Sequence, residues 1–178
     1  MTRIRHRIGI VGDINKIYCS MHEPVGLCGW WATTRDGTPN VGQVLDLHFT
    51  GVVTLSFKIG ALKENDLVRL HCVSGPGPWH DCSLEFSFKQ DADQVWIELV
   101  HENEAASEDD FLYFNTKWTC YLLSLRDLIE KGKGEWCEDP LRRLTRYCRF
   151  LADCQAIFFY FRRCAAILRW YFQVGTVG

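Results

Sequence analysis

The stretch "DDFLYFNTKWTCYLLSLRDLIEKGKG" (Asp109–Gly134) decides the fold, because its apolar residues recur every three or four positions. That spacing places them on one side of an α-helix. The set comprises Phe111, Phe114, Trp118, Tyr121, Leu122, Leu125 and Leu128. Asp109 and Asp110 suit the positive N-terminal end of a helix, and "KGKG" (Lys131–Gly134) is a natural stop. The sequence therefore predicts one long helix with a single apolar stripe.

Five segments before this helix alternate between apolar and polar residues, as half-buried strands do. In "VVTLSFKIG" (Val52–Gly60) one face carries Val53, Leu55, Phe57 and Ile59, and "CSLEFSFK" places Leu84, Phe86 and Phe88 on one face. The predicted strands cover residues 41–49, 52–60, 66–73, 82–89 and 94–101. Their connections are short, which favours antiparallel neighbours.

The N-terminal segment adds one strand and two short helices. "RIRHRIGIV" (Arg3–Val11) alternates basic and apolar residues, and Asp13 is a suitable N-cap for a first helix. Pro24 can open a second helix that ends near Gly29. The order of strand, helix pair, five strands and long helix predicts an α+β fold, in which the apolar face of an antiparallel sheet packs on the long helix.

Four motifs in this order resemble the START-like superfamily (SRPBCC, birch-pollen-allergen-like), in the branch of the activator of the heat-shock chaperone ATPase. They are "GLCGWW", "CVSGPGPWHDCSLEFSF", "WIELVH" and "FNTKWTCYLLSLRDLIEKGKGE". The resemblance runs from Arg5 to about Glu135, and residues 1–135 are predicted to form one domain.

The resemblance implies a helix-grip fold, with a curved antiparallel sheet wrapped around the long helix and an apolar cavity between them. Members of the superfamily bind lipids, sterols, polyketides or other hydrophobic molecules, and some cyclise or hydrate them. The chaperone activator instead docks on its partner protein. The fold therefore constrains function only loosely.

The adjacent indoles of Trp30 and Trp31 should point to different sides, so both cannot occupy one ordinary core layer. One could fill the core while the other lines the cavity entrance; alternatively, both seal an end of the sheet. Trp79 is a candidate for covering the cavity, and Trp118 for lining it. The full set of expected ligand-binding residues is Trp30, Trp31, Phe57, Trp79, Phe86, His101, Phe114 and Trp118.

His101 follows the strand motif "WIELV". It could orient a ligand or act as an acid–base group in a cyclase or hydratase. The alternative is a structural histidine bonded to backbone at a strand end. His80 and Asp81 are adjacent, and adjacent side chains diverge, so no dyad between them is expected. No residue is assigned as catalytic.

The charge and the cysteine content indicate which partners, cellular location and cofactors to expect. The net charge of −2 gives no reason to expect a nucleic acid. The opening residues lack the apolar core of a signal peptide, and nine irregularly spaced cysteines suit reduced thiols, which predicts a cytoplasmic protein. Neither a zinc-ligand spacing nor a phosphate-binding glycine loop is present in the sequence, so no metal or cofactor is expected.

Residues 136–178 form an extension with a different composition. From residue 138 onward there are seven Arg, no Lys and three acidic residues. The segment could be an amphipathic helix that contacts a membrane surface or a partner, or the frameshifted end of a normal gene. A transmembrane span is not expected, because Arg162, Arg163 and Arg169 interrupt its apolar run.

The sequence thus predicts binding of a hydrophobic small molecule, such as a lipid or a polyketide-like compound, between the sheet and the long helix. A chaperone-docking module and a cyclase or hydratase that uses His101 are the alternatives. An open cavity of a few hundred Å³ would favour the binder over the docking module.

Overall fold

The computed structural model describes residues 2–134, with the side chains of Thr2 and Thr34 excepted. The predicted extension, 136–178, lies outside the described residues. The elements are β1 (Thr2–Val11), α1 (Ile14–His22), α2 (Pro24–Trp30), β2 (Thr34–Gly37), β3 (Val44–Phe49), β4 (Val53–Lys63), β5 (Leu67–Ser74), the 3-10 turn η1 (Gly77–Trp79), β6 (Ser83–Asp91), β7 (Gln94–Asn103) and α3 (Glu108–Lys131).

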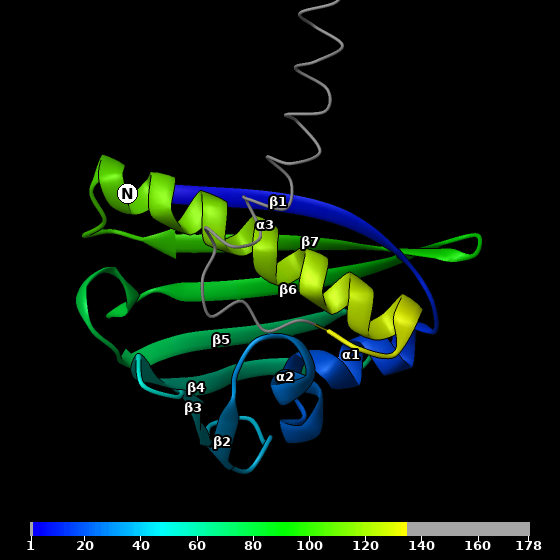
Figure 1. Ribbon diagram of the computed structural model, residues 1–178, viewed down its shortest axis with the longest axis horizontal. Coiled ribbons are helices and arrows are strands. Elements are labelled where there is room, and N and C mark those ends of the chain that lie inside the picture. Colours follow the sequence, from blue (N-terminus) through cyan, green and yellow to red (C-terminus); the bar gives the residue numbers. More distant parts are fainter. Residues whose placement is uncertain (1, 135–178) are drawn as a thin grey trace, which may run out of the picture. The chain divides into compact units, whose positions relative to one another are not determined.

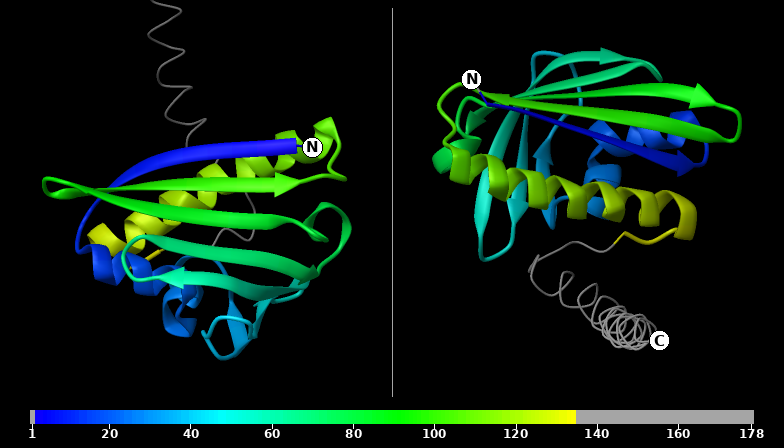
Figure 2. Two further views of the ribbon diagram at one scale, coloured as in Figure 1. Left: turned by 180° about the vertical axis from the view of Figure 1, so that it is seen from behind. Right: turned by 90° about the horizontal axis from the view of Figure 1, so that it is seen from above.

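The seven strands form one antiparallel sheet in the order β1-β7-β6-β5-β4-β3-β2. Consecutive strands from β2 to β7 are neighbours. Strand β1 forms the edge of the sheet opposite β2 and pairs with β7, so that Ile4 lies opposite His101. The sheet is curved, and α3 lies across its inner face, while α1 and α2 lie near the end of α3 (Figures 1 and 2). This arrangement confirms the predicted α+β helix-grip fold.

Local sequence signals fix the helix ends. Asp13 caps α1, its carboxylate accepting a hydrogen bond from the Lys16 amide at 2.8 Å. Ser107 and Asp110 form a reciprocal capping box at the start of α3. Gly132 follows the last turn of α3 in the left-handed conformation, with φ 77°. Such a residue ends a helix at little cost when it is glycine.

Strand β2 was not expected from the sequence, which predicted a loop after the tryptophan pair. Its four residues pair with β3, and the preceding Thr33 amide donates to the His48 carbonyl at 2.9 Å. A segment containing Asp and Gly has low strand propensity. The pairing with β3 therefore decides its conformation.

The alternation of β7 divides its residues between the two faces of the sheet. Val95, Ile97 and Leu99 are fully buried, and His101 retains 2% exposure. On the outer face, Glu98 pairs with Arg5 of β1. The inner positions face α3 and build the core from which the candidate site is made.

One contact joins the end of β1 to α3 directly. The Val11 amide donates to the Glu130 carboxylate at 2.9 Å.

Within residues 2–134, no helix combines the length and the apolar character that crossing a membrane requires.

Candidate functional site

The structure brings the eight expected residues together in one place, which we call the aromatic cluster. Its members are Trp30, Trp31, Phe57, Trp79, Phe86, His101, Phe114 and Trp118, each no more than 7% exposed. They come from α2 and its C-terminal cap, from strands β4, β6 and β7, from η1, and from α3. The cluster fills the region where the inner face of the sheet meets the first half of α3.

Both adjacent tryptophans are fully buried, so the expectation that they could not share a core layer is wrong. Trp30 is the last residue of α2, and Trp31 is its C-cap with φ −120° and ψ −49°. The chain leaves the helical conformation between them, and the two indoles stack with centroids 5.5 Å apart and planes 21° apart. Trp30 donates its indole N–H to the Ser20 carbonyl at 2.8 Å.

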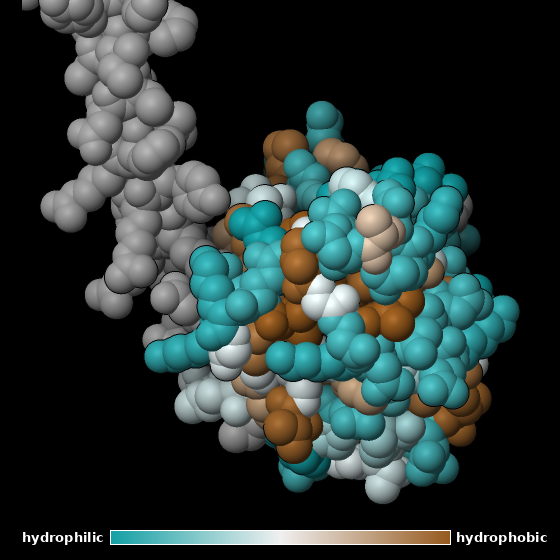
Figure 3. Space-filling view, turned by 90° about the vertical axis from the view of Figure 1, so that its right-hand side faces the viewer, coloured by the Kyte–Doolittle hydropathy of each residue, from teal (hydrophilic) through white to brown (hydrophobic). Residues whose placement is uncertain are grey.

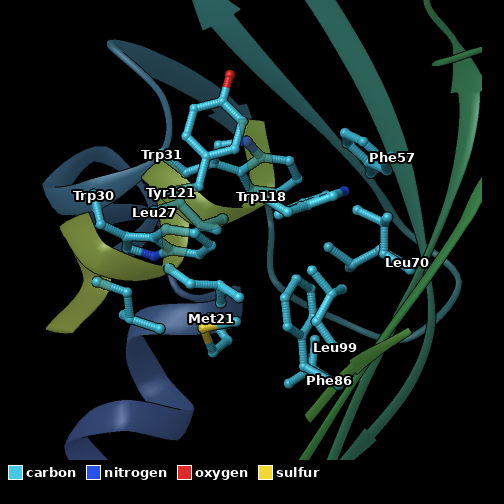
Figure 4. Packing of buried hydrophobic residues seen from close by; sticks show 14 of the residues in the cluster. Met21, Leu27, Trp30, Trp31, Phe57, Leu70, Phe86, Leu99, Trp118 and Tyr121 are labelled. Atoms are coloured by element: carbon cyan, nitrogen blue, oxygen red, sulfur yellow. The ribbon is translucent and has the colours of Figure 1, made fainter. Parts of the chain in front are cut away.

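Trp31 lies at the centre of the cluster. Its ring centroid is 5.4 Å from Phe57 and 5.4 Å from Trp118, distances at which aromatic rings are in contact. Tyr121, which was not in the expected site, lies 6.3 Å away. Figure 4 shows these rings converging between α3 and the sheet, so side chains occupy the region where the cavity was expected.

His101 is hydrogen-bonded to a side chain of α3, and not to backbone as one alternative held. The Trp118 indole N–H donates to His101 Nδ1 at 2.8 Å. An indole nitrogen is only a donor, so Nδ1 accepts and the ring proton of the neutral imidazole lies on Nε2. Burial lowers the pKa of His101 to about 4, because the imidazolium would lose its hydration.

Two buried N–H donors of the aromatic cluster lack an acceptor among the residues that the structure describes. They are His101 Nε2 and Trp31 Nε1. Their rings both contact Trp79 and Trp118. Leaving a buried donor unsatisfied costs about 1–3 kcal/mol. The pair therefore marks a position where an acceptor oxygen would be favourable.

Trp79 is the member of the cluster that stands on a connecting segment, the β5–β6 loop. Its ring stacks on His101 at 5.9 Å and meets Phe114 edge-on at 4.7 Å. Asn103, which sequence reasoning missed, donates from its amide to the Pro78 carbonyl at 2.7 Å and to the His80 carbonyl at 3.1 Å. Asn103 follows His101 by two residues on β7, so the strand period could have placed it on the same face.

The expectation that His80 and Asp81 do not interact is wrong. His80 Nε2 lies 3.3 Å from the Asp81 carboxylate, because Asp81 adopts a left-handed conformation with φ 57° at the turn. Both side chains are more than half exposed. The pair belongs to the surface of the β5–β6 loop and does not reach the cluster.

Within residues 2–134, no three His, Cys, Asp or Glu side chains converge as metal ligands would.

Outside the cluster, the end of the domain that carries the last turn of α3 shows apolar side chains interspersed with polar ones (Figure 3). Val11, 52% exposed, is one of the apolar residues at this end.

The comparisons with known proteins agree with this geometry. The solution structure of the Aha1 dimer from Colwellia psychrerythraea is 33% identical, with a TM-score of 0.65, and the match covers 75% of this chain and all of that one. DynU16, from the dynemicin biosynthetic locus, matches at 11% identity and TM-score 0.68 over 74% of this chain and 48% of its own. CalU16 from Micromonospora echinospora matches at 17% identity and TM-score 0.62, over 75% and 76% respectively.

No family model and no curated protein matches the sequence. The fold and its aromatic interior define a helix-grip protein, and the two matches below 25% identity support that fold alone. The Aha1 match is specific enough to go further. The chain belongs to the START-like superfamily, in the branch of Aha1 homologues, as its motifs predicted.

Proposed function

We propose that the domain binds an apolar small molecule that carries one acceptor oxygen. The apolar part of the ligand lies among the rings of the aromatic cluster, and its oxygen accepts a hydrogen bond from His101 Nε2 or Trp31 Nε1. The observation that carries this proposal is the pair of buried donors without an acceptor among the described residues. A lipid or polyketide-like ketone has the required chemistry.

The ligand enters by movement of the β5–β6 loop. Trp79 contacts five rings of the cluster, and its backbone lies in the short turn η1 of a connecting segment, where Asn103 holds the flanking carbonyls of Pro78 and His80. Withdrawing one indole from the interior vacates the volume of a bicyclic ring. The cavity expected from the sequence thus opens only when the ligand binds, and the open form is part of this proposal.

His101 orients the ligand and does not shuttle protons in this proposal. With its pKa lowered to about 4, the imidazole stays neutral at pH 7 and can donate from Nε2. The groups facing it are Trp79, Phe114 and Trp118, none of which is ionised. We therefore place the domain among binders and not among cyclases or hydratases.

A matched pair of probes tests the proposal, 2-acetylnaphthalene and 2-isopropenylnaphthalene, which differ only in that a methylene group replaces the carbonyl oxygen. The carbonyl of the ketone can accept from His101 or Trp31, and a hydrogen bond of about 1.4 kcal/mol gives a tenfold preference. We expect the ketone to bind about tenfold more tightly in calorimetric titration. In Trp31→Phe and His101→Phe, that preference should fall.

Equal affinity for the two probes in the unmodified protein would refute the role of the donors. No binding of either probe, together with no hydrophobic molecule in native mass spectrometry of protein from its own host, would refute the binder itself.

Docking on a heat-shock chaperone is the second candidate. Ring contacts that fill the interior and 33% identity with an Aha1 favour it. In that case the outer surface of the domain binds the chaperone, and the aromatic cluster serves only as the hydrophobic core. The test is the ATPase rate of the host chaperone, which should rise when this protein is added and stay unchanged if docking is not its function. Either function suits the cytoplasmic location predicted from the sequence.

A further inference from the structure

Cys72 and Cys82 lie at the two ends of the β5–β6 loop that carries Trp79. The Cys72 amide donates to the Cys82 carbonyl at 2.9 Å, extending the ladder by one residue beyond His71 and Ser83. Residues opposite one another in an antiparallel pair have Cα atoms about 4.5–5.5 Å apart. A disulfide spans Cα distances of about 4.4–6.8 Å, so the backbones need not move to join the two residues.

Their side chains point the same way. Both residues are fully buried and continue the inward positions of Leu70 and Leu84. The two thiols interact directly, and each shifts the pKa of the other. Cys72 in turn donates to the Ser74 carbonyl at 3.4 Å. The sulfurs are therefore neighbours, and both are free thiols in this structure.

Their interaction makes the two sulfurs chemically unequal. The Cys82 thiol lowers the pKa of the Cys72 thiol, and burial opposes this shift. The neighbouring Cys72 thiol and burial both raise the pKa of Cys82. A thiolate is the nucleophile in thiol oxidation. This difference, together with the position of the Cys72 sulfur beside the backbone of Gly75, makes Cys72 the candidate for attack on an oxidant and Cys82 the residue that resolves the product.

Only thin cover separates Cys72 from the surface. A Cβ atom built on Gly75 would lie 3.2 Å from the Cys72 sulfur, so Gly75 covers the sulfur with backbone alone. The residues beside it, Ser74 and Pro76, are exposed. A small movement of this segment admits a small oxidant, whereas a bulky reagent would need the loop to unfold.

We propose that Cys72 and Cys82 form a reversible intramolecular disulfide when the protein meets a hydroperoxide. The Cys72 thiolate attacks the peroxide and takes one oxygen as a sulfenic acid, while the O–O bond breaks and the rest leaves as water or an alcohol. The Cys82 sulfur then attacks the Cys72 sulfur, loses its proton, and displaces water. Two thiols lose two electrons, which the peroxide gains.

The product would hold the β5–β6 loop closed by a covalent link at its base. Trp79 lies within that loop, so oxidation restricts its movement away from the aromatic cluster. The disulfide itself depends only on the positions of the two cysteines. Its formation and the binding of a ligand are therefore separate claims that can fail separately.

Peptide mapping of the full-length protein tests the proposal, because trypsin places both cysteines in one peptide. Residues 70–89 contain Cys72 and Cys82 and no other cysteine, and residues 17–35 contain Cys19 and Cys28 as an internal control. The folded protein is treated with hydrogen peroxide, then denatured, alkylated with iodoacetamide and digested.

We expect the peptide 70–89 to be two hydrogen atoms lighter and without label. Dithiothreitol before alkylation should restore both labels, and the control peptide should carry both throughout. Full labelling of 70–89 after peroxide, or its conversion to sulfinic or sulfonic acid without a disulfide, would overturn the proposal. Cross-linking of the control peptide to the same extent would overturn its selectivity.

Two serine variants test the order of attack. In Cys82→Ser the sulfenic acid of Cys72 cannot be resolved by its neighbour, so dimedone added together with denaturant after the peroxide treatment should label Cys72. In Cys72→Ser, Cys82 should stay unlabelled because its thiol is buried and protonated. Labelling of Cys82 alone would reverse the assignment. If either variant does not fold, mapping of the unmodified chain still decides whether the disulfide forms.

Discussion

On the outer face of β7, Glu102 and Glu98 pair with Arg3 and Arg5 of the neighbouring strand. On the inner face, His101 is hydrogen-bonded to Trp118 and surrounded by rings. The outer groups keep much of their hydration, whereas the inner groups have none and depend on each other. The same strand therefore carries contacts that contribute very differently to stability, and the degree of burial determines the size of each contribution.

The strongest test of this contrast is Trp118→Ala. It removes a fully buried indole and leaves His101 Nδ1 without its donor, so we expect the free energy of unfolding to fall by about 4 kcal/mol. Urea denaturation followed by circular dichroism measures it. The matched change on the outer face is Trp96→Ala, for which we expect about 1 kcal/mol. Similar losses from the two variants would break the contrast.

The second test is the pH dependence that His101 imposes. Its pKa is about 4 in the folded protein against an ordinary 6.5, so between these values the unfolded chain takes up a proton that the folded chain does not. Stability should therefore fall as pH decreases from 6.5 to 4, by about 3 kcal/mol, and this contribution should level off below 4.

Comparison with His101→Asn isolates this effect, because an amide oxygen can accept from Trp118 without titrating. The difference in unfolding free energy between the two proteins should shrink by about 3 kcal/mol from pH 7 to pH 4. A constant difference across that range would show that His101 titrates normally and is not desolvated.

A helix-capping contact is expected to contribute less to the free energy of unfolding than the buried contacts of β7 and more than its exposed ion pair. Ser107→Ala removes the acceptor for the Asp110 amide at the start of α3, and we expect a loss of about 1 kcal/mol. Thr119→Ala, at an exposed position within the same helix, is the control and should change stability by less than about 0.5 kcal/mol. Equal effects would mean that the capping box adds nothing.

The smallest effect is expected on the outer face. A double-mutant cycle with Arg5→Gln and Glu98→Gln should give a coupling energy of about 0.5 kcal/mol, because both side chains are at least one-third exposed. The coupling should vanish in 1 M NaCl, where charges are screened within about 3 Å. A coupling above 2 kcal/mol would place this pair with the buried contacts.

Much of the fold followed from periodicity. The three- and four-residue spacing of Phe114, Trp118 and Tyr121 predicted α3, and the alternation around Phe57 predicted β4, because one buried face imposes each pattern. Strand β2 was missed because only its pairing with β3 makes it a strand.

The residues expected to bind a ligand do lie together, but the sequence did not predict the contacts among them, and their role in binding stays a prediction. Nothing in the sequence couples His101 to Trp118, seventeen positions away, or predicts which donors stay unsatisfied. Those facts depend on how rings of fixed volume fit together in three dimensions. Cys72 and Cys82 flank a Gly-Pro-Gly-Pro loop, but only the register of β5 with β6 shows that they are opposite one another.

The pairing of the first strand with the last has a consequence for synthesis on the ribosome. The partner of β1 is β7, whose residues are made about ninety positions later. At about 5–20 residues per second, β1 waits roughly 5–18 s before its hydrogen-bonding partner exists. During that interval Arg3, Arg5 and Arg7 place a positive charge at every second position, and mutual repulsion discourages nascent chains from pairing through this strand.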